Sequence, residues 1–262
     1  MIDNVETIKV MTYNVHSCRG LDGRINPERI AKVIQEADPD LVALQELDVN
    51  RASTNNIDQP ASIAEFLKMD YHFQPAIAVN NEHYGIGILS RYPFQVIKAQ
   101  HLSQDMPVNN ICKTLPIIQY LYEPREVIWI MVQIKDHFVN FFNTHLGLRS
   151  TERRQHMREI VSEQWLGSVH KTSPTILCGD FNAGPRSAEM KALFQYLREA
   201  KASFQNNQVK KTFPSMIPFK ELDHVFYNKY LHLSSAKVIA TKLSRVASDH
   251  LPLMAEFQIS GD

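Results

Sequence analysis

The chain has 262 residues, and its 28 Lys and Arg side chains balance its 28 Asp and Glu side chains, so the formal charge is zero. This length suits one large α/β domain or two small ones, and the neutral balance argues against a dedicated nucleic-acid binder, which usually carries an excess of basic residues. Cys18, Cys112 and Cys178 have no paired spacing, so neither a disulfide framework nor a zinc site is indicated, and reduced thiols in a cytoplasmic protein are expected.

The first part of the chain predicts two core strands with a helix between them. Its opening residues lack the basic start of a signal peptide, and no apolar run reaches the length of a bilayer span. Ile8–Val15 is a β-branched run that predicts a buried strand. Asn26 suits a helix cap and Pro39 ends the helix. Asp40–Leu47 is then a second core strand that ends beside a carboxylate.

The middle of the chain continues with short apolar runs bounded by polar residues, as strands are. A short helix is expected at 61–68, and strands are expected at Gly85–Ser90, Val127–Ile134 and Val139–Leu146, the last two joined by a turn at 135–137.

The last part predicts more strands than helices. One helix is expected across 151–169 and another across 187–197, with strands at 174–182, 222–228, 236–243 and 251–259. No composition shift or linker marks a boundary, so residues 1–262 are expected to form a single domain. Hairpins mixed with crossovers predict a layered α/β domain with mixed sheets.

Polar side chains gather at or just beyond the ends of the predicted strands. They are Asn14, His16, Glu46, Asn143, His145, Asp180, Asn182, Asp223, His224, Asp249 and His250. In a layered α/β domain the strand ends meet along one rim, and ligand sites form at such rims. Alternation along the strand places His16 on the side of Asn14 and turns His224 away from Asp223.

This set of side chains favours a hard cation and phosphate chemistry. Carboxylates such as Glu46, Asp180 and Asp249, with the amide oxygens of Asn14 and Asn182, suit Mg²⁺ or Mn²⁺ better than Zn²⁺. The absence of a glycine-rich phosphate loop and of a G-x-S-x-G motif excludes the kinase and serine-hydrolase classes. A hard cation beside imidazoles fits the attack of water on a phosphoester.

Eight motifs place the chain near a known family. They are MTYNVHS, LVALQELD, YGIGILSRYP, EPRE, FFNTHL, LCGDFNAGP, LDHVFYN and ASDHLPLMAEF. In this order and spacing the chain resembles the endonuclease/exonuclease/phosphatase superfamily from about Lys9 to Phe257. The resemblance implies an α/β (α+β) four-layer sandwich in which two packed mixed β-sheets are flanked by helices. It also implies a metal-dependent hydrolase that acts on phosphoester bonds.

The resemblance assigns roles to the residues of these motifs. Glu46 is the expected principal metal ligand, Asn14 lies beside it, and Asp249 is a further acidic ligand for Mg²⁺ or Mn²⁺. The expected catalytic residues are His250, Asp223 that orients it, Asp180 and Asn182 that position the attacking water, and His145 that binds phosphate. Whether His250 or Asp180 takes the proton of the water stays open.

The substrate is predicted from departures within the family pattern. DNA-repair members have an acid where this chain has His16, and they differ at the motif that holds His145. Both departures favour the phosphatase, sphingomyelinase and small bacterial hydrolase branches. We therefore expect a lipid-headgroup or small-molecule phosphoester. An endonuclease or exonuclease on DNA or RNA is the alternative, and a non-catalytic binding module is the alternative of a different class. The sequence predicts no oligomeric state.

Arg125, Tyr84 and His16 are the expected substrate-binding residues, because a guanidinium fits phosphate and all three lie in or beside the motifs. The alternatives are a salt bridge at a strand start for Arg125 and a packing role for Tyr84. Other arginines that could line the mouth are Arg24, Arg51, Arg149, Arg153 and Arg154. The apolar loop of Phe213, Met216, Ile217 and Phe219 is expected to be packed, with a lid or a lipid-contacting edge as alternatives.

Overall fold

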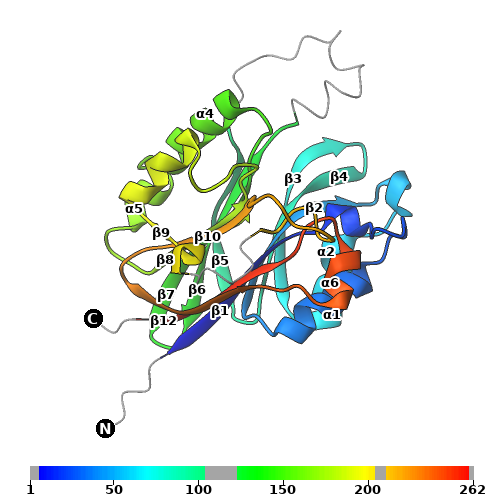
Figure 1. The fold of residues 1–262 in the computed structure, drawn as a ribbon, viewed down its shortest axis with the longest axis horizontal. Coiled ribbons are helices and arrows are strands. Elements are labelled where there is room, and N and C mark those ends of the chain that lie inside the picture. The colour runs from blue at the N-terminus through cyan, green and yellow to red at the C-terminus, as the bar shows by residue number, and fades with distance from the viewer. Residues whose placement is uncertain (1–5, 104–122, 204–210, 260–262) are drawn as a thin grey trace.

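Two β-sheets form the centre of the protein. The structure is a computed structural model, and it describes residues 6–103, 123–203 and 211–259 (Figure 1). In spatial order, the six strands of the first sheet are β11 (Leu231–Val238), β12 (Leu253–Ile259), β1 (Thr7–Asn14), β2 (Leu41–Val49), β4 (Glu82–Ser90) and β3 (Asp70–Val79). The β1–β2 pair is parallel and its neighbours are antiparallel, so the sheet is mixed.

The second sheet repeats this plan. Its six strands, in spatial order, are β5 (Phe94–His101), β6 (Glu126–Ile134), β7 (His137–His145), β8 (Thr175–Asp180), β10 (Asp223–Tyr227) and β9 (Arg198–Glu199). Here β7 and β8 are parallel, and β10 returns antiparallel to β8. Each sheet therefore contains one parallel pair whose carboxyl ends can share a rim.

Helices cover the outer faces of both sheets (Figure 1). The α-helices are α1 (Pro27–Ala37), α2 (Gln59–Leu67), α4 (Ser150–Ile160), α5 (Leu166–Val169) and α6 (Lys242–Ala247), and the 3-10 helices are η1 (His16–Cys18), η2 (Ala52–Thr54), η4 (Ala188–Gln195) and η5 (Ala200–Ser203). No helix among the described residues is long and apolar enough to cross a membrane.

Three apolar cores hold these layers together. Between the sheets, Ile8 of β1 packs in one cluster with Ile130 of β6 and Phe141 of β7. A second core packs α1 and α2 on the first sheet, and a third packs α4 and Trp165 on the second sheet. The layer order is helix, sheet, sheet, helix, which confirms the predicted four-layer sandwich.

The helix between the first two strands forms as predicted. The side-chain oxygen of Asn26 accepts a hydrogen bond from the Arg29 amide at 2.9 Å, and Pro27 occupies the first turn. This cap satisfies an amide that the helix itself leaves unpaired. Asp38 ends α1 in the left-handed conformation, just before Pro39.

Three of the predicted elements are wrong in detail. The expected helix at 151–169 is two helices, because Trp165 leaves helical geometry to enter the third core. The expected helix at 187–197 is the 3-10 helix η4. The expected strand at 236–243 ends at Val238, and Thr241 then caps α6 by accepting a hydrogen bond from the Ser244 amide at 3.1 Å.

The sequence analysis also missed two long strands, β3 and β5. Both are edge strands with many exposed or half-buried side chains, so they carry no continuous apolar run. Of the cysteines, Cys18 and Cys178 are buried free thiols as predicted, and Cys112 lies outside the described residues.

The loop at 213–219 corrects another expectation. Met216, Ile217 and Phe219 expose 53%, 78% and 59% of their surface, so this part of the loop is not packed. Phe213 is half-buried, and its ring lies 4.8 Å from the His250 imidazole, centroid to centroid. We call Met216, Ile217 and Phe219 the apolar knuckle.

Candidate active site

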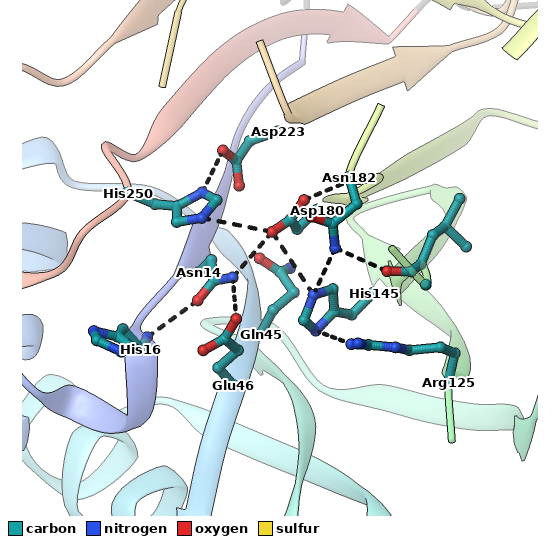
Figure 2. A network of polar contacts seen from close by, with 12 residues as sticks. Asn14, His16, Gln45, Glu46, Arg125, His145, Asp180, Asn182, Asp223 and His250 are labelled. Carbon is teal, nitrogen blue, oxygen red and sulfur yellow. Dashed lines mark hydrogen bonds and ion pairs between the residues drawn. The ribbon is translucent and has the colours of Figure 1, made fainter. Parts of the chain in front are cut away.

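Three adjacent strands of the second sheet present their polar ends in one row. In the strand register, His145 of β7 lies opposite Asp180 of β8, and Asp180 lies opposite Asp223 of β10. Figure 2 shows these side chains converging from their separate strands. The parallel β7–β8 pair and the antiparallel β10 therefore bring together residues that are far apart in sequence.

The first sheet contributes Asn14 and Glu46 from its parallel pair. The Asn14 amide nitrogen donates to Glu46 Oε1 at 2.8 Å and to Asp180 Oδ2 at 3.0 Å (Figure 2). Asn14 is buried at the end of β1, where it spans the gap between the two sheets. One amide group thus ties a carboxylate of one sheet to a carboxylate of the other.

Several of these site residues lie where the backbone departs from regular strand geometry, which orients their side chains. The pairing of β2 with β4 shifts register between Leu44 and Leu47, and Glu46 sits in this bulge with a φ of 59°. Asn182 and His16 also have left-handed φ values, both 49°. Each such residue costs about 1–3 kcal/mol, and strain of this kind is concentrated at functional sites.

His250 is paired with a carboxylate. Its Nδ1 lies 2.8 Å from Asp223 Oδ2, and its Nε2 lies 3.7 Å from Asp180 Oδ2. Burial alone disfavours the imidazolium, but the negative charges of Asp223 and Asp180 outweigh it and raise the pKa of His250 to about 10. His250 is therefore a cation at neutral pH.

His145 lies on the other side of Asp180. Its Nε2 is 3.7 Å from Asp180 Oδ2, and its Nδ1 is 3.0 Å from the Arg125 guanidinium. Burial, reinforced by the charges of Arg125 and His250, holds the pKa of His145 well below its usual range. This imidazole is neutral.

Asn182 completes this side of the site. Its backbone amide donates to Asp180 Oδ1 at 2.9 Å, which forms the expected turn after β8. Its side-chain nitrogen donates to the Leu146 carbonyl at 2.9 Å and faces His145 Nε2 at 3.2 Å. Its position is therefore fixed from two directions.

The carboxylates of the site differ in their electrostatic surroundings. Burial, with the charges of Asp249 and Asp180, raises the pKa of Glu46 to about 7. Burial and the charge of Asp223 also raise the pKa of Asp180. Burial acts in the same sense on Asp223, but His250 outweighs it and lowers its pKa. Negative charge is therefore in excess around Glu46 and Asp180, which a cation would relieve.

Among the described residues, the clustered metal-ligating side chains are not the ones predicted to bind the metal. Asp180, Asp223 and His250 present ligand atoms within 4.8 Å of one another, so this buried group could hold a metal ion. His250 is already bound to Asp223 as a cation, and a cation is no ligand. The predicted ligands Glu46 and Asp249 are half-buried and so more open to solvent. The contact of Asp249 with His16, at 3.8 Å, is longer than that of Asp223 with His250.

The remaining predicted residues lie at different depths. His16 Nδ1 is 3.8 Å from Asp249 Oδ1 at the exposed edge, and the His16 amide donates to Asn14 Oδ1 at 3.1 Å. Arg125 and Tyr84 are 3% and 9% exposed, so the structure places them beneath the surface. As predicted, His224 points away from this cluster, to Glu199 and the Ala183 carbonyl.

The other arginines named from the sequence do not share one position. Arg51 and Arg153 are engaged by Asp48 and Glu189, and Arg149 lies 3.6 Å from Glu152. These ion pairs show no phosphate-binding arrangement among the three.

Three supporting residues, Gln45, Ser248 and Lys201, were missed by the sequence analysis. Beneath the site, Gln45 donates to Asn143 Oδ1 at 2.8 Å, and Asn143 donates to the Leu44 carbonyl at 2.9 Å, which joins the sheets. Ser248 donates to the Asn14 carbonyl at 2.8 Å, and Lys201 donates to the Asp223 carbonyl at 2.7 Å. Gln45 and Ser248 lie inside quoted motifs, but Lys201 has no such signal.

Comparison with known proteins agrees with this architecture. Residues 11–250 match the Endonuclease/Exonuclease/phosphatase family. By sequence, the uncharacterized protein YbhP of Escherichia coli (strain K12) is 22% identical over 263 residues, which cover 97% of each chain.

Two solved structures are similar in fold. A functionally unknown conserved protein from Enterococcus faecalis V583 has a TM-score of 0.75 and 20% identity, and the match covers 97% of this chain and 100% of that one. The mannosyl-6-phosphatase Bt3783 of Bacteroides thetaiotaomicron VPI-5482 has a TM-score of 0.72 and 20% identity, over 95% of this chain and 99% of that one. At these identities the likeness shows a shared fold.

Proposed function

The chain belongs to the endonuclease/exonuclease/phosphatase family, and we propose that it is a divalent-metal-dependent phosphoesterase in which water attacks phosphorus without a covalent intermediate. Residues 1–262 would act as one catalytic domain. The observation that carries the proposal is the unbroken series of polar contacts from Glu46 through Asn14 and Asp180 to His250 and Asp223. Family members hydrolyse phosphoester bonds with such groups.

Glu46 and Asp249 would hold the metal, with Asn14 beside them. The Asn14 oxygen accepts one hydrogen bond, from the His16 amide, and keeps a second lone pair. Burial and the charges of Asp249 and Asp180 raise the pKa of Glu46, and a bound cation would stabilise its charged form. Bound Mg²⁺ or Mn²⁺ would neutralise charge on the phosphoryl oxygens. Oxygen ligands of this kind favour these two ions.

Asp180 is better suited than His250 to accept the proton of the attacking water. His250 already carries both of its ring protons, because Asp223 and Asp180 stabilise the imidazolium. It can therefore donate from Nε2 to the phosphoester but cannot accept another proton. The raised pKa of Asp180 makes it a stronger base than an ordinary carboxylate.

The favoured substrate is a lipid-headgroup or small-molecule phosphoester. The zero net charge lowers the case for a long nucleic acid, and the similar Bacteroides thetaiotaomicron protein is a mannosyl-6-phosphatase. The apolar knuckle supports a substrate with an apolar part, since Phe213 of the same loop contacts His250. Exposed apolar side chains beside a site commonly mark a binding surface.

A metal-dependent hydrolysis screen tests this proposal. The substrates are bis-p-nitrophenyl phosphate, sugar and inositol phosphates, phospholipids in vesicles, plain DNA and abasic DNA, each with Mg²⁺, Mn²⁺ or a chelator. We expect hydrolysis that depends on the metal and is fastest on one of the small or lipid phosphoesters.

The outcomes separate the alternatives. Preferred cleavage of DNA or RNA would replace the favoured substrate by the nuclease alternative. Metal-independent hydrolysis, or none on any substrate, would contradict the proposed function. Replacing the three knuckle residues by Ser should slow only the lipid reaction. The matched control replaces Phe138 and Val79, which are 49% and 58% exposed elsewhere.

A further inference from the structure

Arg125 lies behind His145 rather than at the surface. Its Nη1 is 3.0 Å from His145 Nδ1 (Figure 2). Its Nη2 is 3.0 Å from Glu123 Oε2, and the residue is 3% exposed. We infer that Arg125 is a positioning residue that fixes the single ring proton of His145 on Nε2, on the side that faces Asp180 and Asn182. The inference rests on the proposed function, because it assigns the hydrogen-bonding role of a residue in that same site.

The proton assignment follows from what each group can donate. A guanidinium has only N–H groups and stays protonated throughout the physiological range, so it can donate but cannot accept. His145 Nδ1 must therefore be the acceptor in this contact. A neutral imidazole has one bare nitrogen and one N–H group, so the remaining proton lies on Nε2.

The surroundings also oppose a second proton on His145. The residue is 4% exposed, and the guanidinium of Arg125 and the cationic His250 are both close to it. Asp180, whose Oδ2 is 3.7 Å from His145 Nε2, opposes these two charges but is shared with His250 and Asn14. Protonation of Nδ1 would place two N–H groups against each other at 3.0 Å.

This assignment gives His145 a specific task. Asn182 Nδ2 already donates to the Leu146 carbonyl, so its nitrogen and not its oxygen faces His145 Nε2 at 3.2 Å. With the ring proton on Nε2, His145 and Asn182 present two N–H donors 3.2 Å apart that make no hydrogen bond to each other, and Asp180 Oδ2 lies 3.7 Å from Nε2. An anionic oxygen of a substrate would suit these two donors. His145 would donate to a phosphoryl oxygen without carrying charge and could not serve as the base.

The Arg125 side chain is fixed by contacts on the side away from His145. Glu123 pairs with its guanidinium and accepts a hydrogen bond from the Tyr84 side chain, and Arg51 lies 5.7 Å from the centre of the Tyr84 ring. This buried line orients the guanidinium toward His145. It also explains why Tyr84 and Arg125, both expected to bind substrate, lie beneath the site.

NMR of the labelled histidine ring nitrogens tests the inference without any substrate. The His145 signals are assigned by their loss in His145→Gln. We expect a bare Nδ1 and a protonated Nε2 in the wild-type protein at neutral pH. Arg125→Met should populate both neutral forms. A proton on Nδ1 in the wild type, or an Arg125→Met spectrum identical to wild type, would overturn the assignment.

Kinetics on a substrate identified by the screen supply the second measurement. Arg125→Met should lower kcat about 10- to 100-fold with little change in KM, as does the loss of a residue that orients a functional histidine. In a His145→Gln background the same change should cost little, because the two residues act as a unit. A raised KM with unchanged kcat, or full additivity, would instead show that Arg125 binds substrate directly and would refute the inference.

Two further variants keep the test decisive. If Arg125→Met does not fold, Arg125→Lys takes its place in the test. This variant retains a cation and a donor, so it should preserve the wild-type ring signals. Arg158→Met removes an exposed arginine from α4 and should change neither spectrum nor rate. Absence of hydrolysis in the wild type would refute the proposed function, while the NMR result would still decide the His145 assignment.

Discussion

His250 and His145 are two buried imidazoles with opposite partners. Each has its Nε2 3.7 Å from Asp180 Oδ2, but Asp223 contacts Nδ1 of the first at 2.8 Å and Arg125 contacts Nδ1 of the second at 3.0 Å. The pKa of His250 rises to about 10, whereas that of His145 falls well below its usual range. Burial disfavours the charged form of both, so the sign of the partner decides which imidazole is a cation.

This difference gives the two histidines beside Asp180 different roles. A cationic His250 can transfer or share a proton, and a neutral His145 can only present one N–H group. The same residue type thus supplies two functions within one small site.

The largest expected effect comes from replacing each histidine by Gln, whose amide can donate a hydrogen bond but cannot carry the charge. His250→Gln should lower kcat/KM by about 10²- to 10⁴-fold, because proton transfer is lost. His145→Gln should cost only about 10-fold, since a donor remains near the Nε2 position. Steady-state rates with saturating metal measure both.

His145→Ala is the matched control for the second substitution and should cost about 10²-fold, as removal of an oxyanion donor does. Equal losses in His250→Gln and His145→Gln would mean that the two imidazoles do not differ in role.

A smaller effect is expected from removing the partner charge of His250. In Asp223→Asn the pKa of His250 should fall by about 1–3 units, because an opposite charge has been lost. If the imidazolium is the active form, wild-type activity declines as pH rises through about 10, and the variant should decline at lower pH. The pH profile of kcat/KM measures this shift.

The same pair affects stability with a defined sign. The pKa of His250 is higher in the folded state than in the unfolded chain, so its contribution is fully present below the ordinary value of 6.5 and is lost as pH rises through about 10. The free energy of unfolding of the wild type, measured relative to Asp223→Asn, should therefore decrease over that range. An increase would contradict the ion pair.

The smallest effect concerns Glu46, which the first sheet contributes to the site. Its folded-state pKa of about 7 lies above its ordinary 4.5, so the metal-free protein loses stability as pH rises through 7. Divalent metal must displace that proton below pH 7, so Mg²⁺ affinity should fall about tenfold from about pH 8 to about pH 6. Calorimetric titration measures the change.

Glu46→Gln is the control, because it binds metal weakly and should show little pH dependence over the same range. Wild-type affinity that does not change with pH would place the metal away from Glu46.

The central secondary structure could be predicted because its signals are local. The strand at Ile8–Val15 and the capped helix after Asn26 follow from β-branched runs, capping chemistry and helical periodicity. The edge strands β3 and β5 could not be found in the same way. Their pairing is decided by a neighbouring strand rather than by their own apolar pattern.

The sequence by itself determined that hard oxygen ligands and histidines follow the core strands, because alternation and strand ends are local properties of the chain. Only the tertiary structure decided which charge each histidine meets. Asp223 precedes His250 by 27 residues and Arg125 precedes His145 by 20. Asp223 lies on β10 of the second sheet, whereas His250 lies just before β12 of the first sheet; Arg125 lies just before β6, which pairs with β7. The packing of the two sheets and the pairing of strands, and not separation along the chain, therefore set the distance between charges and thus the proton that each imidazole holds.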